Sequence, residues 1–165
     1  MSTLYKAPAG TMVGHVHLKV TDLDLALKFY RDLPGFELTA MYGDQAAFLS
    51  ADGYHHHIGL NTWHSKEGTP APQRAAGIYH TAFLYLTRKD LAVIVKRLIE
   101  NGYPISGASD HGVSEVIYLN DPDGNGVELY RDRTKDEWTY REDGTIGMVT
   151  EPLDLEDLLA ELKPD

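Results

Sequence analysis

The stretch GHVHLKVTDLDLALKFYRDLPGFEL, residues 14–38, decides the fold because it passes from a strand pattern into a helix pattern. Residues 13–20 (VGHVHLKV) are rich in β-branched side chains and predict a strand. Thr21, followed three residues later by Asp24, forms a helix-start box. An apolar stripe at helical spacing then runs through Leu23, Ala26, Leu27 and Tyr30. The stretch therefore predicts a strand that leads directly into a helix.

Turn signals divide the following residues into short strands. Pro34 and Gly35 end the predicted helix. Three strand-like segments come next, FELTAMY, QAAFLSA and HHHIGLNTW, and they are separated by Gly-Asp and Asp-Gly turn signals. The first half of the chain thus predicts the order βαβββ.

The same order recurs in the second half. Residues 78–86 (IYHTAFLYL) predict a strand, and Thr87 with Asp90 repeats the helix-start box. LAVIVKRLIENG supplies a second apolar stripe that stops at Gly102, and short strands follow with a strong turn at Asp123-Gly124. The features that align are His15 with His80, Thr21 with Thr87, and Gly35 with Gly102. An internal duplication of this kind pairs two half-cores into one domain.

The predicted fold is α+β, with two paired βαβββ modules whose strands form a curled mixed sheet around a cleft. We expect the modules at residues 12–65 and 77–133, joined by the linker GTPAPQRAAG, so that one domain spans 12–133. Residues 134–165 form a C-terminal extension. Within it, DEWTYREDGTIGM predicts a loop or small hairpin, and EPLDLEDLLAELK predicts an amphipathic acidic helix. This helix either docks on the body of the domain or makes a subunit contact.

Composition narrows the class of partner. The 165 residues are 42% hydrophobic, which suits a globular domain with a real core, and the formal charge of −10 argues against nucleic acid as a partner. No apolar run reaches membrane-spanning length, and MSTLYKAPAGTMVG contains no apolar signal core. The chain has no cysteine, so any metal site must use His, Asp, Glu or Tyr. We expect a cytoplasmic protein without a membrane partner.

Three polar residues on apolar strands predict a metal site. His15 and His80 sit near the starts of matching strands, and Glu128 lies in GVELY, the last strand of the second module. A buried carboxylate is costly unless it is paired or bound to metal. Two histidines and one carboxylate on converging strands form the facial triad of non-haem Fe(II) sites. A strand histidine is more often a hydrogen-bonded core residue, but the repeat symmetry favours the metal interpretation.

The sequence resembles a known family at these residues. GHVHLKVTDLDLALKFYRDLPGFEL, GIYHTAFLYL and DPDGNGVELY are similar to the vicinal oxygen chelate superfamily, which includes glyoxalase I, fosfomycin-resistance proteins and extradiol dioxygenases. The resemblance covers about residues 12–133. HHHIGLNTW, GASDHGVSE and YLNDPDGNGVELY narrow it to proteins that resemble catechol 2,3-dioxygenases. Related folds also host lyases, transferases and binding proteins.

The resemblance implies a role for each candidate residue. It implies metal ligands at His15, His80 and Glu128, which would hold Fe(II), with Mn(II) as the alternative. It implies that the substrates are a catechol-type aromatic diol and O₂. Around the metal it implies an acid/base histidine at His56, a pocket histidine at His111 and a pocket tyrosine at Tyr118.

His55, His56 and His57 cannot all serve one site if they lie in a strand, because neighbouring side chains there point to opposite faces. We expect His56 to face the pocket and its two neighbours to face away. A one-residue slip would place His57 inside instead, where it could act as a fourth ligand. His17 shares the strand face of His15 and is either a neighbour of the site or a core residue.

Two departures from the family pattern shape the remaining expectations. Many extradiol enzymes carry a further pair of modules, so we expect a more open site or one completed by a second subunit, and hence a homodimer. The glyoxalase I pattern needs a second glutamate where this chain has histidines, which argues against a zinc or nickel isomerase. The alternatives are a lyase, epimerase or thiol transferase using Mn²⁺, Zn²⁺ or Ni²⁺, and a metal-free, ligand-sequestering protein of the bleomycin-resistance kind.

Overall fold

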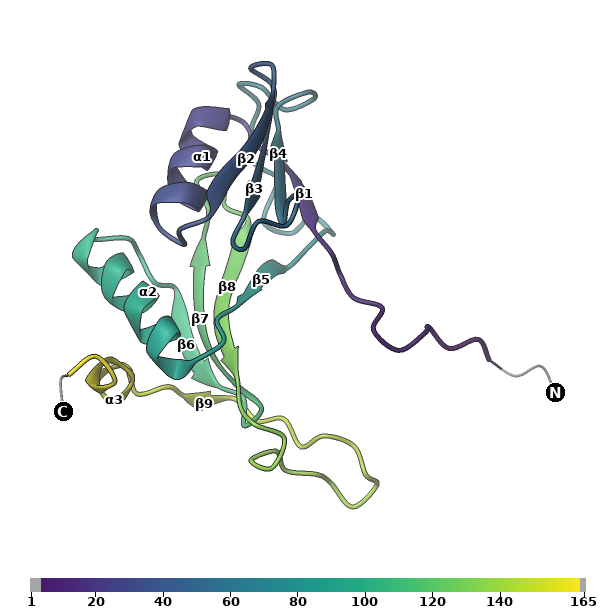
Figure 1. The fold of residues 1–165 in the computed structure, drawn as a ribbon, viewed down its shortest axis with the longest axis vertical. Coiled ribbons are helices and arrows are strands. Elements are labelled where there is room, and N and C mark those ends of the chain that lie inside the picture. The colour runs from purple at the N-terminus through teal and green to yellow at the C-terminus, as the bar shows by residue number, and fades with distance from the viewer. Residues whose placement is uncertain (1–3, 164–165) are drawn as a thin grey trace.

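The computed structural model describes residues 4–163 and contains the βαβββ order twice, as predicted (Figure 1). The first module consists of β1 (Val16–Lys19), α1 (Leu23–Asp32), β2 (Glu37–Tyr42), β3 (Ala46–Ser50) and β4 (Ile58–Asn61). The second consists of β5 (His80–Leu84), α2 (Arg88–Glu100), β6 (Gly107–Asp110), β7 (Ser114–Asn120) and β8 (Gly126–Asp132). The C-terminal extension adds β9 (Glu151–Pro152) and α3 (Leu155–Ala160).

The strands form two mixed sheets with matching topology. The first has the order β1-β4-β3-β2, and the second has the order β5-β8-β7-β6-β9. In each module the first strand pairs in parallel with the last, β1 with β4 and β5 with β8, and the other pairs are antiparallel. The predicted α+β class is therefore confirmed, and the duplication extends to strand order. The strands of the two modules belong to separate sheets rather than to one continuous sheet.

The two helices begin in different ways, and one predicted start is wrong. Thr87 caps α2, as predicted, and its side chain accepts a hydrogen bond from the Asp90 backbone N–H. In α1 the cap is Asp22, whose carboxylate accepts from the Leu25 N–H at 2.9 Å. Thr21 instead donates from its backbone N–H and its hydroxyl to Asp123 of the second module.

Gly35 and Gly102 follow the ends of the two helices, as the turn signals predict. Both adopt positive φ, at +85° and +62°, a conformation in which glycine avoids the steric cost of a side chain. The chain can therefore reverse direction after each helix and enter the strands of the same module.

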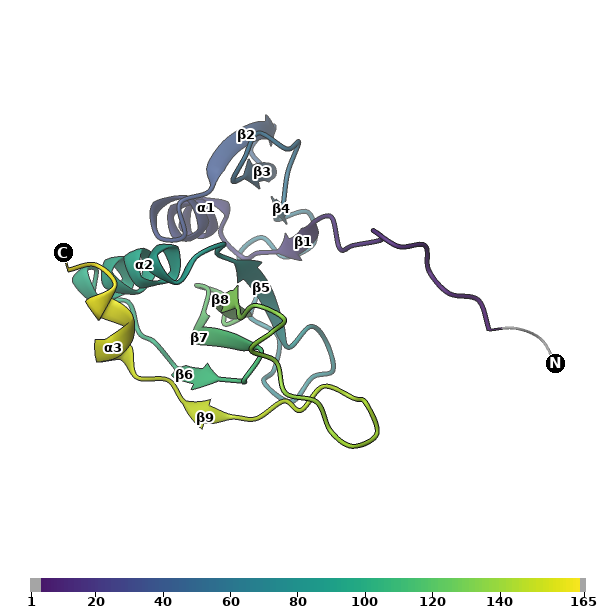
Figure 2. The ribbon, with the colours of Figure 1, turned by 60° about the horizontal axis from the view of Figure 1, so that its bottom comes forward.

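One hydrophobic core joins the two modules. Figures 1 and 2 show α1 and α2 along one side of the molecule and the strands along the other. Aromatic rings meet across the module boundary, since Phe83 of β5 lies 4.9 Å from Phe36 and 6.3 Å from Tyr30 between ring centroids. Phe29 similarly lies 5.2 Å from Tyr103. Burial of these rings holds the modules as one body.

A buried carboxylate reinforces this boundary. Asp121, only 4% exposed, begins the DPDGN turn between β7 and β8. The fully buried Tyr30 of α1 donates its hydroxyl to Asp121 at 3.0 Å. Burial and the neighbouring carboxylate raise the pKa of Tyr30, so its hydroxyl stays protonated and can serve as the donor.

The C-terminal extension lies against the second module. β9 pairs with β6 through Ser109–Pro152 and Asp110–Glu151, and α3 packs its buried Leu158 into the common core. An isolated bridge between Tyr140 and Ile146 forms the predicted small hairpin. The predicted docked helix is therefore what the structure shows.

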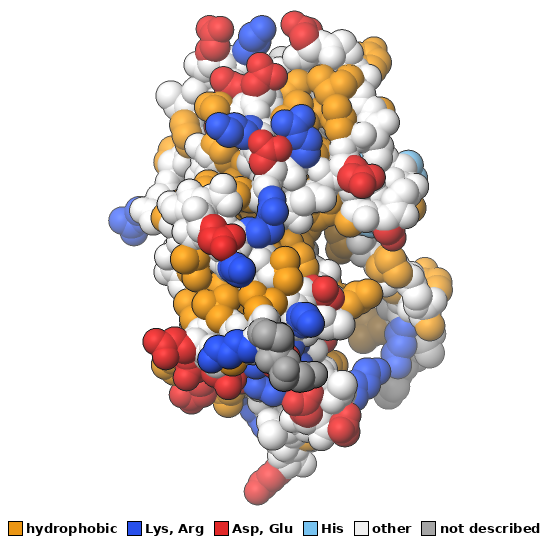
Figure 3. All heavy atoms as spheres, turned by 60° about the vertical axis from the view of Figure 1, so that its left-hand side comes forward, with side chains coloured by type: hydrophobic (Ala, Val, Ile, Leu, Met, Phe, Trp, Pro, Cys, Tyr) orange, Lys and Arg blue, Asp and Glu red, His pale blue; other side chains and the backbone are white. Residues whose placement is uncertain are grey.

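The face formed by the helices carries no histidine cluster. In Figure 3 acidic and basic side chains are interspersed with apolar ones, and histidine appears only at the margin of the view. Within residues 4–163 no helix has the length and hydrophobicity needed to span a membrane.

The Tyr30–Asp121 contact yields the first testable prediction. Tyr30→Phe removes one donor from a buried charged acceptor, so the free energy of unfolding should fall by about 1.5–3 kcal/mol. Urea denaturation measures this change. The matched control is Tyr42→Phe, because Tyr42 is 68% exposed, and its stability should stay within about 0.5 kcal/mol of the parent. Equal effects of the two substitutions would contradict a special role for this contact.

Candidate active site

The predicted site residues of the second module share the sheet face that points away from the helices. In β8, Val127 and Leu129 are buried in the core, so Glu128 between them points to the opposite face. In β5, Phe83 packs against the core, which places His80 and Ala82 on the same face as Glu128. Alternation along two hydrogen-bonded strands therefore brings one histidine and one carboxylate together.

His80 and Glu128 form a close pair. His80 Nε2 lies 3.4 Å from Glu128 Oε2, and the two side chains are 32% and 12% exposed. The other ring nitrogen, His80 Nδ1, is buried and finds no hydrogen-bond partner within residues 4–163. Gly126 pairs with His80 in the register, and a Cβ there would collide with the Tyr79 carbonyl and crowd His80 Cβ. A residue without a side chain thus leaves room for the histidine.

Tyr118 and His111 lie beside this pair. Tyr118 of β7 is directly opposite Glu128 of β8, and its hydroxyl lies 2.8 Å from His111 Nε2. Burial and the nearby Glu128 carboxylate raise the pKa of Tyr118 to about 12. The tyrosine is therefore neutral near pH 7 and has one hydroxyl proton to donate.

The histidines of the first module form a second group. The His56 ring lies 4.4 Å from the His15 ring between centroids and 5.0 Å from Phe48. His55 Nδ1 lies 2.7 Å from His56 Nδ1. Partial burial, and then the neighbouring histidines with His15 first, lower the pKa of His56 because both disfavour its charged form.

The three consecutive histidines lie before the strand rather than in it. β4 begins only at Ile58, so strand alternation does not decide where they point. His57 Nδ1 lies 3.2 Å from the buried Ser50 hydroxyl, and its Nε2 lies 3.8 Å from Asp52. His56 thus contacts His15 while His57 contacts β3 and the loop after it. The acid/base role of His56 stays a prediction.

His17 lies across a glycine on the first sheet. Its ring packs near Phe48 and Trp63, at 5.8 and 5.7 Å between centroids. A Cβ at Gly59 would come within 2.9 Å of that ring, so only glycine leaves the space. Burial, and then the nearby His15, lower the pKa of His17.

The structure brings together two of the three predicted metal ligands. An imidazole and a carboxylate are donors that divalent metals accept, and the unpartnered Nδ1 of His80 fits a missing ligand. His15 contacts His55 and His56 instead. Among residues 4–163, no three His, Asp or Glu side chains are grouped so that they could hold a metal ion.

Sequence reasoning missed two contacts around the site. Val149 of the C-terminal extension places its carbonyl oxygen 2.8 Å from His111 Nδ1. Glu115, with a side chain 3% exposed, is bound by Arg88, Arg131 and Arg133. No local pattern joins residues so far apart in sequence, although three arginines near an acidic residue on an apolar strand were a signal that could have been noticed.

Comparison with known proteins identifies relatives of several activities. The model of the Glyoxalase/Bleomycin resistance protein/Dioxygenase superfamily matches residues 12–129. A catechol-2,3-dioxygenase of Bacillus subtilis is 39% identical over 152 residues, which cover 92% of this chain and 52% of that protein. The chain thus spans about half the length of that relative.

Two further relatives differ in named activity. Biphenyl-2,3-diol 1,2-dioxygenase 3 of Rhodococcus globerulus is 33% identical over 156 residues, which cover 87% of this chain and 79% of that protein. The metallothiol transferase FosB of Staphylococcus epidermidis is 28% identical over 132 residues, which cover 79% of this chain and 88% of that protein.

A solved structure supports the fold. A glyoxalase/dioxygenase from Nostoc punctiforme superposes with a TM-score of 0.66 and 19% identity, covering 81% of this chain and 99% of that one. At this identity the likeness concerns the fold alone.

Proposed function

Because this chain belongs to the Glyoxalase/Bleomycin resistance protein/Dioxygenase superfamily, we propose that it is an extradiol dioxygenase that cleaves the ring of a catechol-type diol with O₂. The dioxygenase relatives imply a divalent metal site. We propose Fe(II) as the metal, with Mn(II) as the alternative. The physiological setting would be the breakdown of small aromatic compounds.

The observation that carries the proposal is the pairing of His80 and Glu128 beside Tyr118 and His111. One imidazole and one carboxylate on adjacent strands supply two of the ligands of a facial triad. Two hydrogen-bonding side chains on the next strand then face the same space. This arrangement can hold a metal and orient a polar substrate next to it.

We assign the third ligand to His15. When bound, Fe(II) would bring the diol and O₂ together on one ion, which supplies the proximity that their direct reaction lacks. His80, Glu128 and His15 would hold the ion. Since His15 does not lie with the other two in one chain, we propose a homodimer in which a second copy supplies it.

The remaining residues would bind the substrate and move its protons. His56, beside His15, would take a phenolic proton from the diol and return it later, a role suited to an imidazole. Tyr118 and His111 would hydrogen-bond the substrate oxygens from the second module. The two groups approach the substrate from different sheets.

A second candidate function is metal-dependent thiol transfer. The likeness to a metallothiol transferase favours it, because that match covers 88% of a protein built on a similar scale. A lyase, an isomerase or a ligand-sequestering protein with the same fold would be further members of this group. Anaerobically purified protein should contain iron and consume O₂ with a catechol; consumption of a thiol with no catechol cleavage would favour the transferase.

Metal retention tests the ligand set. Glu128→Ala removes one ligand, so the variant should lose the metal while keeping the fold, because ligand bonds are needed to hold the ion. Metal analysis and circular dichroism measure the two properties. Glu37→Ala, on the exposed strand β2, is the matched control and should retain metal. If Glu128→Ala holds iron as well as the parent, the triad assignment is wrong.

The acid/base role of His56 can be separated from metal binding. His56→Phe should keep iron and bind a catechol, yet turn over about 10²- to 10⁴-fold more slowly, because it lacks the proton acceptor. Its pH–rate profile should lose one limb near neutrality. His55→Phe and His57→Phe are the controls and should behave like the parent. An inactive His57→Phe with an active His56→Phe would assign the role to His57.

The shared site is tested by mixing inactive variants. His15→Ala and Glu128→Ala should each be inactive, but mixed dimers would contain one intact site made from the unaltered residues of both copies. Random exchange of subunits should restore about a quarter of the parent activity, since half of the dimers are mixed and each has one complete site of two. No recovery, with light scattering showing a monomer, would contradict the shared site.

A further inference from the structure

His111 is held at both ring nitrogens by different parts of the chain. Its Nδ1 lies 2.8 Å from the carbonyl oxygen of Val149, and its Nε2 lies 2.8 Å from the Tyr118 hydroxyl. The Val149 N–H donates back to the His111 carbonyl at 3.1 Å. A Cβ at Gly112 would lie 3.3 Å from Val149 Cγ2, so this part of the extension sits directly on the turn that carries His111.

The chemistry of the two partners decides which nitrogen carries the proton. A carbonyl oxygen can only accept, so the short contact to Val149 requires a proton on Nδ1. The Thr150 hydroxyl is the other group near Nδ1, but it is farther away, at 3.4 Å. In a neutral imidazole with a proton on Nδ1, Nε2 is an acceptor, so Tyr118 donates its hydroxyl proton to it.

This direction matters because Tyr118 has one proton and two acceptors within reach. Glu128 is its partner across the β7–β8 pair, and His111 Nε2 is the other acceptor. A proton given to His111 leaves both oxygens of Glu128 free to face His80 and a metal. With the opposite tautomer, Nε2–H would donate to Tyr118, whose proton would then be directed at Glu128.

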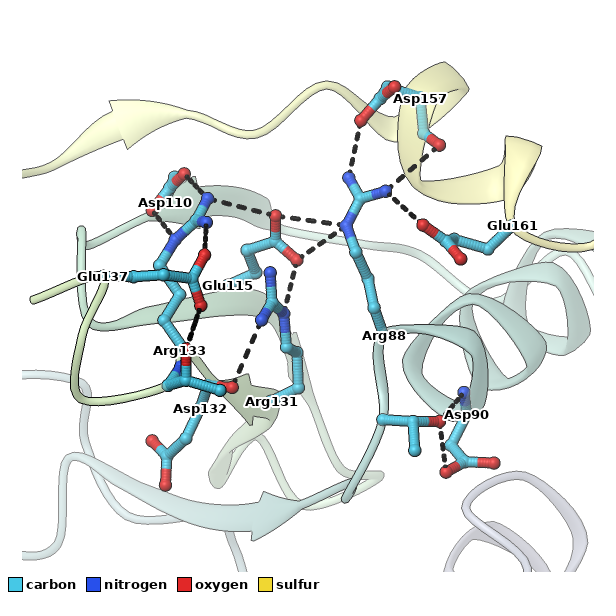
Figure 4. Close-up of polar contacts among 12 residues, drawn as sticks. Arg88, Asp90, Asp110, Glu115, Arg131, Asp132, Arg133, Glu137, Asp157 and Glu161 are labelled. Atoms are coloured by element: carbon cyan, nitrogen blue, oxygen red, sulfur yellow. Dashed lines mark hydrogen bonds and ion pairs between the residues drawn. The ribbon is translucent and has the colours of Figure 1, made fainter.

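The segment that carries Val149 is anchored on both sides. Before it, Arg133 binds Asp110 of β6 and Glu137 (Figure 4). After it, β9 pairs with β6, and the α3 residues Asp157 and Glu161 bind Arg88 at 2.7 and 2.9 Å (Figure 4). The Val149 carbonyl is therefore held at a defined place relative to His111.

We propose that the segment of residues 134–150, which lies outside the matched family domain, acts as a positioning element that locks His111 in the Nδ1–H tautomer and so directs the Tyr118 proton away from Glu128. The catalytic consequence rests on the proposed function, whereas the lock itself does not. The C-terminal extension thereby becomes part of the site rather than an accessory to the fold.

The tautomer can be measured directly on the full chain. Nitrogen NMR of ¹⁵N-histidine-labelled, metal-free protein at a pH where His111 is neutral distinguishes the two tautomers, and His111→Gln identifies the signal. The expected result is a single Nδ1–H form of His111. An Nε2–H form, or an exchanging mixture, would overturn the proposal.

Two proline substitutions test whether the C-terminal segment sets the tautomer. Val149→Pro removes the N–H that binds the His111 carbonyl and should release the ring into a mixture of tautomers. Its kcat for a catechol should fall about 10- to 100-fold, as for loss of a hydrogen bond that orients a site histidine, with a smaller change in KM. Met148→Pro is the matched control, one residue earlier and on a 56% exposed side chain, and should match the parent.

The outcomes separate the lock from the proposed reaction. A folded Val149→Pro that keeps the single tautomer would overturn the role of the segment. If Val149→Pro does not fold, the measurement on the unaltered chain still decides whether the lock exists. If the parent shows the Nδ1–H form but cleaves no catechol, the lock stands and the dioxygenase proposal fails.

Discussion

The arrangement of this molecule depends on the carboxylate of Asp121. It accepts hydrogen bonds from the backbone N–H groups of Asp123 and Asn125, from the Asn125 side chain, and from Tyr30 of the first module. A carboxylate 4% exposed would be costly without these donors, so the turn, the tyrosine and the charge require one another. Because this turn ends β7 and starts β8, the same contact sets where Tyr118 and Glu128 stand relative to α1.

Much of the fold could be predicted from local pattern, and the errors lie where distant contacts override it. The repeated strand–helix–strand order was legible because it rests on periodicity and turn residues. The start of α1 was misplaced by one residue because both Thr21 and Asp22 are good caps, and the second module takes Thr21 for Asp123. Nothing within a few residues of Thr21 carries that information.

The candidate site shows the same division. His80 and Glu128 were predicted as neighbours, and alternation in paired parallel strands does place them together. His15 was predicted beside them, yet its position depends on how one module faces another, which periodicity does not encode. The assumption that residues 55–57 alternate as a strand was wrong, since β4 starts at Ile58. The contact between His111 and Val149 spans a sequence separation that only the folded chain reveals.

The irregular edge strand β2 links protection against aggregation to the histidine loop. All six residues of β2 are exposed, and its register with β3 shifts between Leu38 and Ala40. Such a bulge disrupts the regular row of backbone donors and acceptors that would otherwise template the addition of a foreign strand. The hydroxyl of Thr39, within the bulge, lies 3.1 Å from the Phe48 carbonyl and 2.9 Å from the His55 carbonyl. A substitution that regularised this edge would therefore carry two penalties, a greater tendency to form intermolecular sheets and a loosened backbone beneath His55 and His56.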